Sequence, residues 1–314
     1  MSEESYHGKP YHDLGLLAFQ NRFPDEKSCF EYFMKMRWPN GCRCINGCAG
    51  KMYLVKKRRV NVYECEKCGR QTYATAGTMF HGNRQPLRKW FWAIFLMATS
   101  KKGISMIYLQ QQLGIKSYRS AWLMGHKIRR AMRERDSTYM LKGTVQADEI
   151  FIGGKQSRAE QRATGTNKTA FFIGVEENEK GRPRFVTFEE LKEIYDQQIV
   201  RAVEKKIRKG STIKSDGGGA YKKAKKKGYA IEQSVYQYNP RMTAEHLKWV
   251  NMLTSNLKRF LLSTYHGVFP KYRDAYLAEF AYRFNRRYWP DQAFDRLLYA
   301  CINAKPITLP ALKA

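Results

Sequence analysis

The sequence lacks any long apolar run, and its acidic residues are scarce. No stretch approaches the roughly 20 consecutive apolar residues of a membrane span, and no apolar core follows a basic start, so we expect neither anchor nor signal peptide. Asp and Glu number 28 against 57 Lys and Arg, which gives a formal net charge of +29. Solubility alone needs a charge of only about 2–8 in a small domain. The excess favours a polyanionic partner, with nucleic acid ahead of a membrane surface.

The sequence also lacks an internal repeat, and its 314 residues suffice for two domains or for one large domain with an appendage. Periodicity and composition predict five segments. These are a helical N-terminal segment (1–40), a cysteine-rich strand-like segment (41–80), a helical region (85–136), a domain of alternating strands and helices (140–290) and a C-terminal tail (291–314), of which 306–314 are expected to be irregular. The pattern indicates an α/β or mixed fold class.

The fourth segment predicts three strands, a helix, a strand, a helix, a strand and a long helix. The expected ranges are 144–152, 170–176, 183–188, 189–209, 211–215, 220–227, 230–236 and 243–262. This order is that of ribonuclease-H-like domains. Residues 156–169 are polar and lack periodicity, which is typical of a mobile basic loop.

The seven cysteines indicate a metal site rather than disulfides, because a chain without an export signal stays in a reducing compartment. Two closely spaced groups can meet around one structural zinc ion, and the favoured ligands are Cys44, Cys48, Cys65 and Cys68. Cys42 with Cys44 is the alternative first pair, although its one-residue gap is short. Buried structural cysteines or a redox pair are disfavoured, because five cysteines fall within 27 positions. Cys29 and Cys301 stand apart and are expected to be buried.

Two basic clusters are candidates for contact with DNA. The first lies between the cysteine groups and comprises Lys56, Lys57, Arg58 and Arg59. The second lies in a predicted helix–turn–helix, where helices 104–113 and 117–132 flank Gly114 and Ser117 is the candidate N-cap. The second helix carries basic residues that suit phosphate contacts, namely Arg119, His126, Lys127, Arg129, Arg130 and Arg133. An ordinary basic helical hairpin packed on the main domain is the alternative.

Asp148 and Asp216 stand at the ends of predicted strands in this basic chain. A carboxylate beside an apolar strand is costly unless it is paired or binds a cation. If the strands are adjacent, the carboxylates can share two Mg²⁺ (or Mn²⁺) ions, which activate the attacking oxygen and stabilise the leaving oxygen in displacement at phosphorus. The simpler interpretation is that each aspartate caps a turn. Gly153-Gly154-Lys155 lacks the full phosphate-loop pattern, so no nucleotide site is expected.

These motifs together resemble the ISXO-type transposases of small bacterial insertion sequences, over about residues 25–290 and in the same order. The resemblance rests on Arg37-Trp-Pro-Asn-Gly41, Cys65–Gly69, Gly77-Thr-Met-Phe-His81, Pro86-Leu-Arg-Lys-Trp90, Asp148-Glu-Ile-Phe-Ile-Gly-Gly-Lys155, Lys214-Ser-Asp-Gly217, Leu257-Lys-Arg259, Ser263-Thr-Tyr-His-Gly267 and Glu279-Phe-Ala-Tyr-Arg-Phe-Asn-Arg-Arg287. It implies a zinc ribbon, a helical DNA-binding part and a ribonuclease-H-like DDE domain that cuts and joins element ends.

The resemblance also implies a third metal ligand, commonly a Glu seven positions before the Lys of the Lys-Arg pair. That lysine is Lys258, followed by Arg259, and the matching position holds Asn251, whose side-chain oxygen can ligate Mg²⁺ without adding charge. Seven residues are close to two helical turns, so Asn251 and Lys258 share a face, where Lys258 can hold a DNA phosphate. Glu245 and Glu279 are the fallback ligands.

The implied partners are double-stranded DNA, as element inverted repeats and as target, and further copies of the chain in a homo-oligomer on DNA. The implied place is the bacterial cytoplasm, in association with the nucleoid. A DNA-binding regulator of transposase descent without chemistry is the principal alternative, and Asn251 is the feature that favours it. A structural RNA-binding zinc protein ranks lower, because Tyr and Phe recur at core-like spacing.

Overall fold

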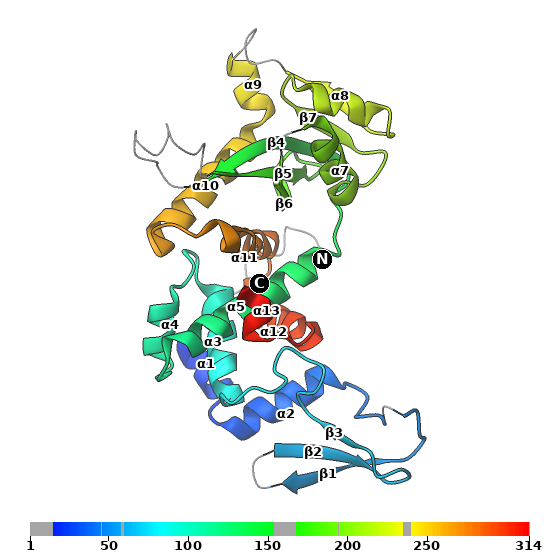
Figure 1. Cartoon of the computed structure of the whole chain (residues 1–314), viewed down its shortest axis with the longest axis vertical. Helices are drawn as coiled ribbons and strands as arrows, with labels where there is room; N and C mark the ends of the chain where they lie inside the picture. Colours follow the sequence, from blue (N-terminus) through cyan, green and yellow to red (C-terminus); the bar gives the residue numbers. More distant parts are fainter. Residues whose placement is uncertain are drawn as a thin grey trace. The chain divides into compact units, whose positions relative to one another are not determined.

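The computed structural model describes residues 15–44, 46–57, 60–153, 168–193, 195–234 and 240–313. The contacts divide the chain into two compact units (Figure 1). Unit 1 comprises Met1–Ser100, Met106–Met132 and Tyr288–Ala314, and unit 2 comprises Lys101–Ser105 and Arg133–Arg287. The loop expected at 156–169 lies outside the described residues except at its last two positions. Within the part of the chain that is described, no helix is both long and apolar enough to cross a membrane.

Unit 1 is mainly helical. Its helices are α1 (Leu16–Arg22), α2 (Glu26–Arg37), α3 (Leu87–Thr99), α4 (Met106–Gln112), the greater part of α5 (Tyr118–Asp136), α12 (Ala293–Asn303) and α13 (Leu309–Lys313), with a 3-10 turn at Pro290–Gln292. Phe294 of α12 contacts Phe19 and Phe91 at ring-centroid distances of 4.9 and 5.3 Å. Since Phe19 lies on α1 and Phe91 on α3, aromatic packing joins the two ends of the chain in one core.

The described part of 306–314 is more ordered than the sequence predicted. Residues 293–303 form α12, and the segment expected to be irregular contains α13. Thr308 precedes α13, and its hydroxyl accepts a hydrogen bond from the Ala311 N–H at 3.5 Å. A short N-cap of this kind satisfies a donor of the first helical turn, which the low apolar content of the segment did not reveal.

A small antiparallel sheet of unit 1 contains β1 (Met52–Lys57), β2 (Val60–Cys65) and β3 (Gln71–Tyr73), in the order β1-β2-β3. Met52 pairs with Cys65, and Tyr63 pairs with both Leu54 and Thr72. This register places the cysteines that flank the hairpin at the same end of the sheet.

The sheet of unit 2 is mixed. It contains β4 (Thr144–Ile152), β5 (Thr169–Glu177), β6 (Pro183–Leu191), β7 (Thr212–Ser215) and β8 (Ala230–Gln233). The spatial order is β6-β5-β4-β7-β8, in which β4, β5 and β6 are antiparallel neighbours and β7 and β8 run parallel to β4. The order of elements along the chain is the one predicted from the sequence as far as β8, after which two helices stand in place of the one expected.

Helices cover both faces of this sheet (Figure 1). One face carries α7 (Asp196–Lys206) and α8 (Gly219–Lys225), and the other carries α10 (Lys248–Tyr265) and α11 (Arg273–Asn285). The remaining elements are α9 (Pro240–His246) and a 3-10 turn at Pro270–Tyr272. Because strand residues alternate, Ala147 of β4 is buried with α7 and α8, whereas Ile150 is buried with α10 and α11. Asp148 therefore shares the α10 side of the sheet with Ile150.

Three predicted boundaries were wrong. The helix expected at 189–209 begins at Asp196, because Leu191 pairs with Ala170 as the last residue of β6. The helix expected at 243–262 is two helices, since Leu247 departs from helical geometry with φ −110° and ψ 26°. Pro86 precedes α3 as its N-cap instead of occupying the first helical position.

Candidate metal centres and nucleic-acid interface

The structure brings four thiols together. The sulfur atoms of Cys44, Cys48, Cys65 and Cys68 all lie within 4.8 Å of one another, and the Sγ atoms of Cys44 and Cys68 are 3.6 Å apart. Tetrahedral zinc with Zn–S bonds of about 2.3 Å needs sulfur–sulfur separations of about 3.8 Å, so the group fits a closed four-thiolate site. The same four cysteines are those that the spacing favoured.

Two turns present these thiols. The Gly69 N–H donates to the Cys65 carbonyl at 2.8 Å, and the Gly47 N–H donates to the Cys44 carbonyl at 3.0 Å. Both glycines have positive φ, +65° and +73°, which L side chains rarely adopt. Each cysteine pair is thus bent around a turn that needs glycine.

The thiols of this group compete for protons. Donation from the Arg70 backbone and from neighbouring thiols lowers the pKa of Cys68 to about 7, whereas hydrogen bonds to Cys68 and Cys44 raise the pKa of Cys48 to about 12. Zinc binding replaces such shared protons, so metal affinity rises with pH.

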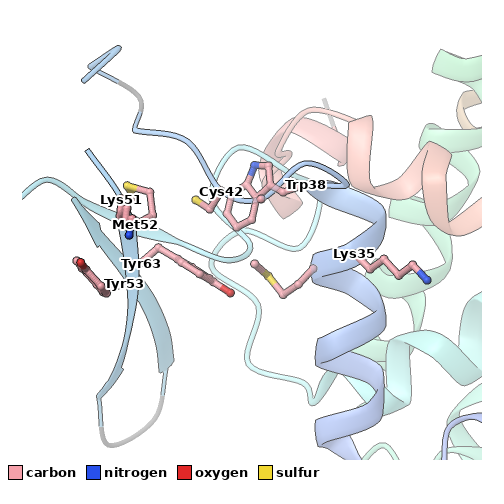
Figure 2. A pocket seen from close by; sticks show the side chains of 9 residues that line it. Lys35, Trp38, Cys42, Lys51, Met52, Tyr53 and Tyr63 are labelled. Carbon is pink, nitrogen blue, oxygen red and sulfur yellow. The ribbon is translucent and has the colours of Figure 1, made fainter. Parts of the chain in front are cut away.

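Cys42 lies elsewhere, in an open cavity of about 550 Å³ between the end of α2 and the β1–β2 hairpin (Figure 2). The cavity is lined by Met34, Lys35, Trp38, Gly41, Cys42, Lys51, Met52, Tyr53 and Tyr63. Trp38 meets Tyr63 edge to face at 5.5 Å, and the Arg37 guanidinium lies 4.3 Å from the centre of the Trp38 ring. The alternative first pair, Cys42 with Cys44, is thus not the arrangement found, because Cys48 and not Cys42 lies with Cys44 in the cluster.

The register between β4 and β7 indicates that the two candidate catalytic aspartates occupy neighbouring positions. These parallel strands pair Gln146 with Lys214. Continued by two residues, the same register sets Asp148 beside Asp216, which directly follows β7. Adjacent strands lie about 4.8 Å apart, so the two carboxylates emerge from neighbouring positions. Burial, together with the charge of Asp216, raises the pKa of Asp148 to about 6, while the Glu149 N–H bound to its Oδ1 at 2.8 Å opposes that shift.

Asp216 also organises the loop that follows it. Its Oδ1 accepts a hydrogen bond from the Gly218 N–H at 3.0 Å, as expected for an aspartate that caps a turn. A Cβ on Gly218 would stand 3.1 Å from that same oxygen, so glycine permits the close approach. Gln233 Nε2 donates to the carbonyls of Asp216 and Gly218, both at 2.9 Å. The turn-capping role therefore coexists with the position beside Asp148.

Glu149 is a third carboxylate of β4 and the loop beside it, and it was not among the predicted site residues. It lies on the opposite face of β4 from Asp148, and its Oε1 accepts a hydrogen bond from the Tyr221 hydroxyl at 2.7 Å. Burial raises the pKa of Glu149 to about 7, with smaller contributions from Asp148, Asp216 and Asp196, although the Tyr221 bond opposes the shift. The signal available in the sequence was that Glu149 directly follows Asp148.

The residues implied by resemblance lie on α10. Asn251, Lys258 and Arg259 are exposed and flank the buried stripe of that helix, and Arg259 donates to Asn256 Oδ1 at 2.9 Å. Of the fallback ligands, Glu245 is exposed on α9. Glu279 is fully buried on α11, where the Tyr265 hydroxyl donates to it at 3.2 Å and Arg283 lies 4.0 Å away. Glu279 thus has a structural role inside the core.

The helical basic cluster is only partly available to DNA. Arg119 is exposed and Arg130 is partly buried. His126 stacks on Trp122 with ring centroids 4.0 Å apart, and Arg129 is fully buried. Lys127, predicted to contact DNA, is buried, and its ammonium donates to the Met79 carbonyl at 3.1 Å. That prediction is corrected, because α5 turns this face toward the core of unit 1 and not toward solvent.

The other basic cluster, Lys56–Arg59, cannot be placed. The side chains of Lys56 and Lys57 and the whole of Arg58 and Arg59 lie outside the described part of the structure. Their contact with DNA stays a prediction.

Two parts of the chain match models of known families. Residues 140–285, which contain the aspartates and α10, match the family model of the ISXO2-like transposase domain. Residues 24–71, which contain the thiols, match that of the transposase zinc-ribbon domain. The chain thus matches two transposase domain families, a zinc ribbon and an ISXO2-like domain. A protein of the transposable element ISH50 from Halobacterium salinarum, named as uncharacterized, is 26% identical over 132 residues. This match covers 41% of the chain and 43% of the relative.

Proposed function

We propose that the chain is a DNA transposase that binds the ends of its element, cuts them and joins them to target DNA. The observation that supports the proposal is the β4–β7 register, because its last pair, Gln146 with Lys214, lies two residues before Asp148 and Asp216. The helix that bears Asn251, α10, packs against β4. The sheet order, with three antiparallel strands followed by two parallel ones, supports a ribonuclease-H-like domain. The net charge of +29 supports double-stranded DNA as the partner.

In this proposal the two carboxylates and the Asn251 amide hold divalent metal ions, for which hard oxygen donors are suited. When bound, Mg²⁺ or Mn²⁺ stabilises charge on the attacking and leaving oxygens of phosphoryl transfer. Lys258, exposed seven residues from Asn251 on α10, holds a phosphate of the strand to be cut. Zinc in the four-thiol site keeps the ribbon folded, and copies of the chain act together on paired ends.

The test is cleavage of labelled DNA carrying the flanking inverted repeats, in Mg²⁺ and in Mn²⁺. Wild type is compared with Asp148→Asn, which removes one charge without changing side-chain size. Glu204→Gln is the matched control, because it removes a carboxylate of the same unit whose ion pair is with Lys227, at 3.7 Å, and not with a proposed site residue. We expect Asp148→Asn to lower the cleavage rate by about 10³-fold or more, and Glu204→Gln to leave it unchanged.

Equal cleavage by wild type and Asp148→Asn would contradict the proposal. Salt-sensitive DNA binding without cleavage by wild type, in either metal, would instead identify a DNA-binding regulator.

A further inference from the structure

Gln146 is a buried amide at the centre of unit 2. It is 2% exposed on β4, in the face covered by α10. Its Oε1 accepts hydrogen bonds from the backbone N–H groups of Trp249 and Val250, at 2.9 and 3.2 Å. Its Nε2 donates to Glu177 Oε1 at 2.6 Å, and Glu177 Oε2 accepts from Lys214 Nζ at 3.1 Å. The partners fix the amide orientation, because backbone N–H groups need its oxygen and the carboxylate needs its nitrogen.

Each end of this network lies next to a residue of the proposed metal site. Gln146 precedes Asp148 by two residues on the same face of β4, and Lys214 precedes Asp216 by two residues. Val250 is directly followed by Asn251. The network therefore joins the three elements that carry Asp148, Asp216 and Asn251.

The contact with α10 also fixes where that helix begins. The first N–H groups of a helix have no partner within the helix, and the N-cap residue Leu247 makes no side-chain cap bond. Gln146 accepts from two of those N–H groups, so a side chain of β4 caps a helix that follows about a hundred residues later. A capped start holds Asn251, one turn into α10, at a fixed height above β4.

We propose that Gln146, Glu177 and Lys214 form a positioning network that sets Asn251 against Asp148 and Asp216. The inference rests on the proposed function and adds to it residues that touch neither metal nor DNA. A displacement of about 1 Å in a reacting constellation costs about 10²-fold in rate, so loss of the network acts on the turnover step. DNA affinity stays as in wild type, because the exposed basic residues are unchanged.

The experiment uses the full chain with Gln146→Leu, Gln146→Glu, Glu177→Gln and the double exchange Gln146→Glu with Glu177→Gln. Cleavage rate, DNA affinity and Mn²⁺ affinity are measured for each. Gln146→Leu removes the cap, and Gln146→Glu sets two carboxylates against each other, so each should lower the rate by about 10²-fold at unchanged DNA affinity. The double exchange restores a donor to the pair, and its rate should return to within about tenfold of wild type.

Asn285→Leu is the matched control. Asn285 is also a buried amide of unit 2, and it joins α11 to Val186 of β6 with bonds of 2.8 and 3.0 Å. Neither element carries a proposed site residue. This variant should lose stability as Gln146→Leu does, yet its folded fraction should cleave DNA and bind Mn²⁺ like wild type.

Two failures are distinguishable. If wild type cleaves DNA and Gln146→Leu matches it in rate and Mn²⁺ affinity, or if the double exchange rescues nothing, the network has no positioning role. If wild type never cleaves DNA, the proposed function fails. Mn²⁺ affinity then decides whether the network positions the metal site. The positioning role is supported if Gln146→Leu weakens Mn²⁺ affinity and Asn285→Leu does not. It is overturned if both variants bind Mn²⁺ equally well.

Discussion

The two candidate metal sites are built in opposite ways. The four thiols come from two glycine turns of one small sheet, between Cys44 and Cys68. The carboxylate site draws Asp148 from β4, Asp216 from the loop after β7 and Asn251 from α10. A local site of soft ligands is completed by its metal, whereas a site spread over three elements depends on the fold to bring it together.

Removal of zinc should affect the four-thiol site and not the carboxylate site, and it is the largest effect that we expect. Structural zinc contributes on the order of 10 kcal/mol in small ribbons and fingers, so chelation should unfold β1–β3 and leave the β4–β8 sheet folded. Hydrogen exchange after chelation measures this, with loss of amide protection expected in β1–β3 only. Cys65→Ser should reproduce the effect, while Cys42→Ser should not, because Cys42 lines the neighbouring cavity. Full protection of β1–β3 without metal would contradict the account.

The pH dependence of stability should differ between the two units. In unit 1, burial and the nearby Arg129 charge lower the pKa of His126 to about 3. An unfolded histidine titrates near 6.5, so the unfolded state binds the proton first, and stability present above that pH is lost as pH falls toward 3. The loss is on the order of 5 kcal/mol. His126→Gln should reduce this loss of unfolding free energy at low pH. Urea unfolding followed by hydrogen exchange of α5 measures it. His81→Gln, a change at an exposed histidine, should leave the loss unchanged.

Glu149 of unit 2 gives the opposite slope. Its folded pKa is about 7, above the 4.5 that is ordinary for a glutamate, so the unfolded state loses its proton first. Its destabilising contribution is absent below about pH 4.5 and grows to on the order of 3 kcal/mol as pH rises through 7. Glu149→Gln should remove that decline in metal-free protein, measured by hydrogen exchange of β4, while Glu204→Gln should retain it. An identical decline in Glu149→Gln would show that its burial carries no such cost.

The sequence predicted what is local and missed what is long-range. The cysteine spacing selected the four clustered thiols, and the local pattern of the chain located the five strands of the unit 2 sheet. A glutamine inside a predicted strand does not reveal its hydrogen-bond partners. The sequence therefore could not predict that Gln146 caps α10. Lys127 belonged to a basic helix, but only tertiary packing decides which basic residues of a helix turn inward.

The smallest expected effect contrasts an exposed lysine with a buried one. Lys258→Ala removes a proposed phosphate contact and should reduce the slope of log affinity against log salt by about 1, with a loss of about 1 kcal/mol. Lys127→Met removes the bond to the Met79 carbonyl and should lower stability without changing that slope. DNA titrations at several salt concentrations measure both. Equal slopes for wild type and Lys258→Ala would remove Lys258 from the interface.

The central claim is that Asp148 and Asp216 share a metal site, and Mn²⁺ binding followed by electron paramagnetic resonance tests it most directly. Wild type should bind Mn²⁺, Glu204→Gln should bind it equally, and Asp148→Asn and Asp216→Asn should each weaken the same sites by about tenfold or more. Unchanged Mn²⁺ affinity in either aspartate variant would contradict a shared site.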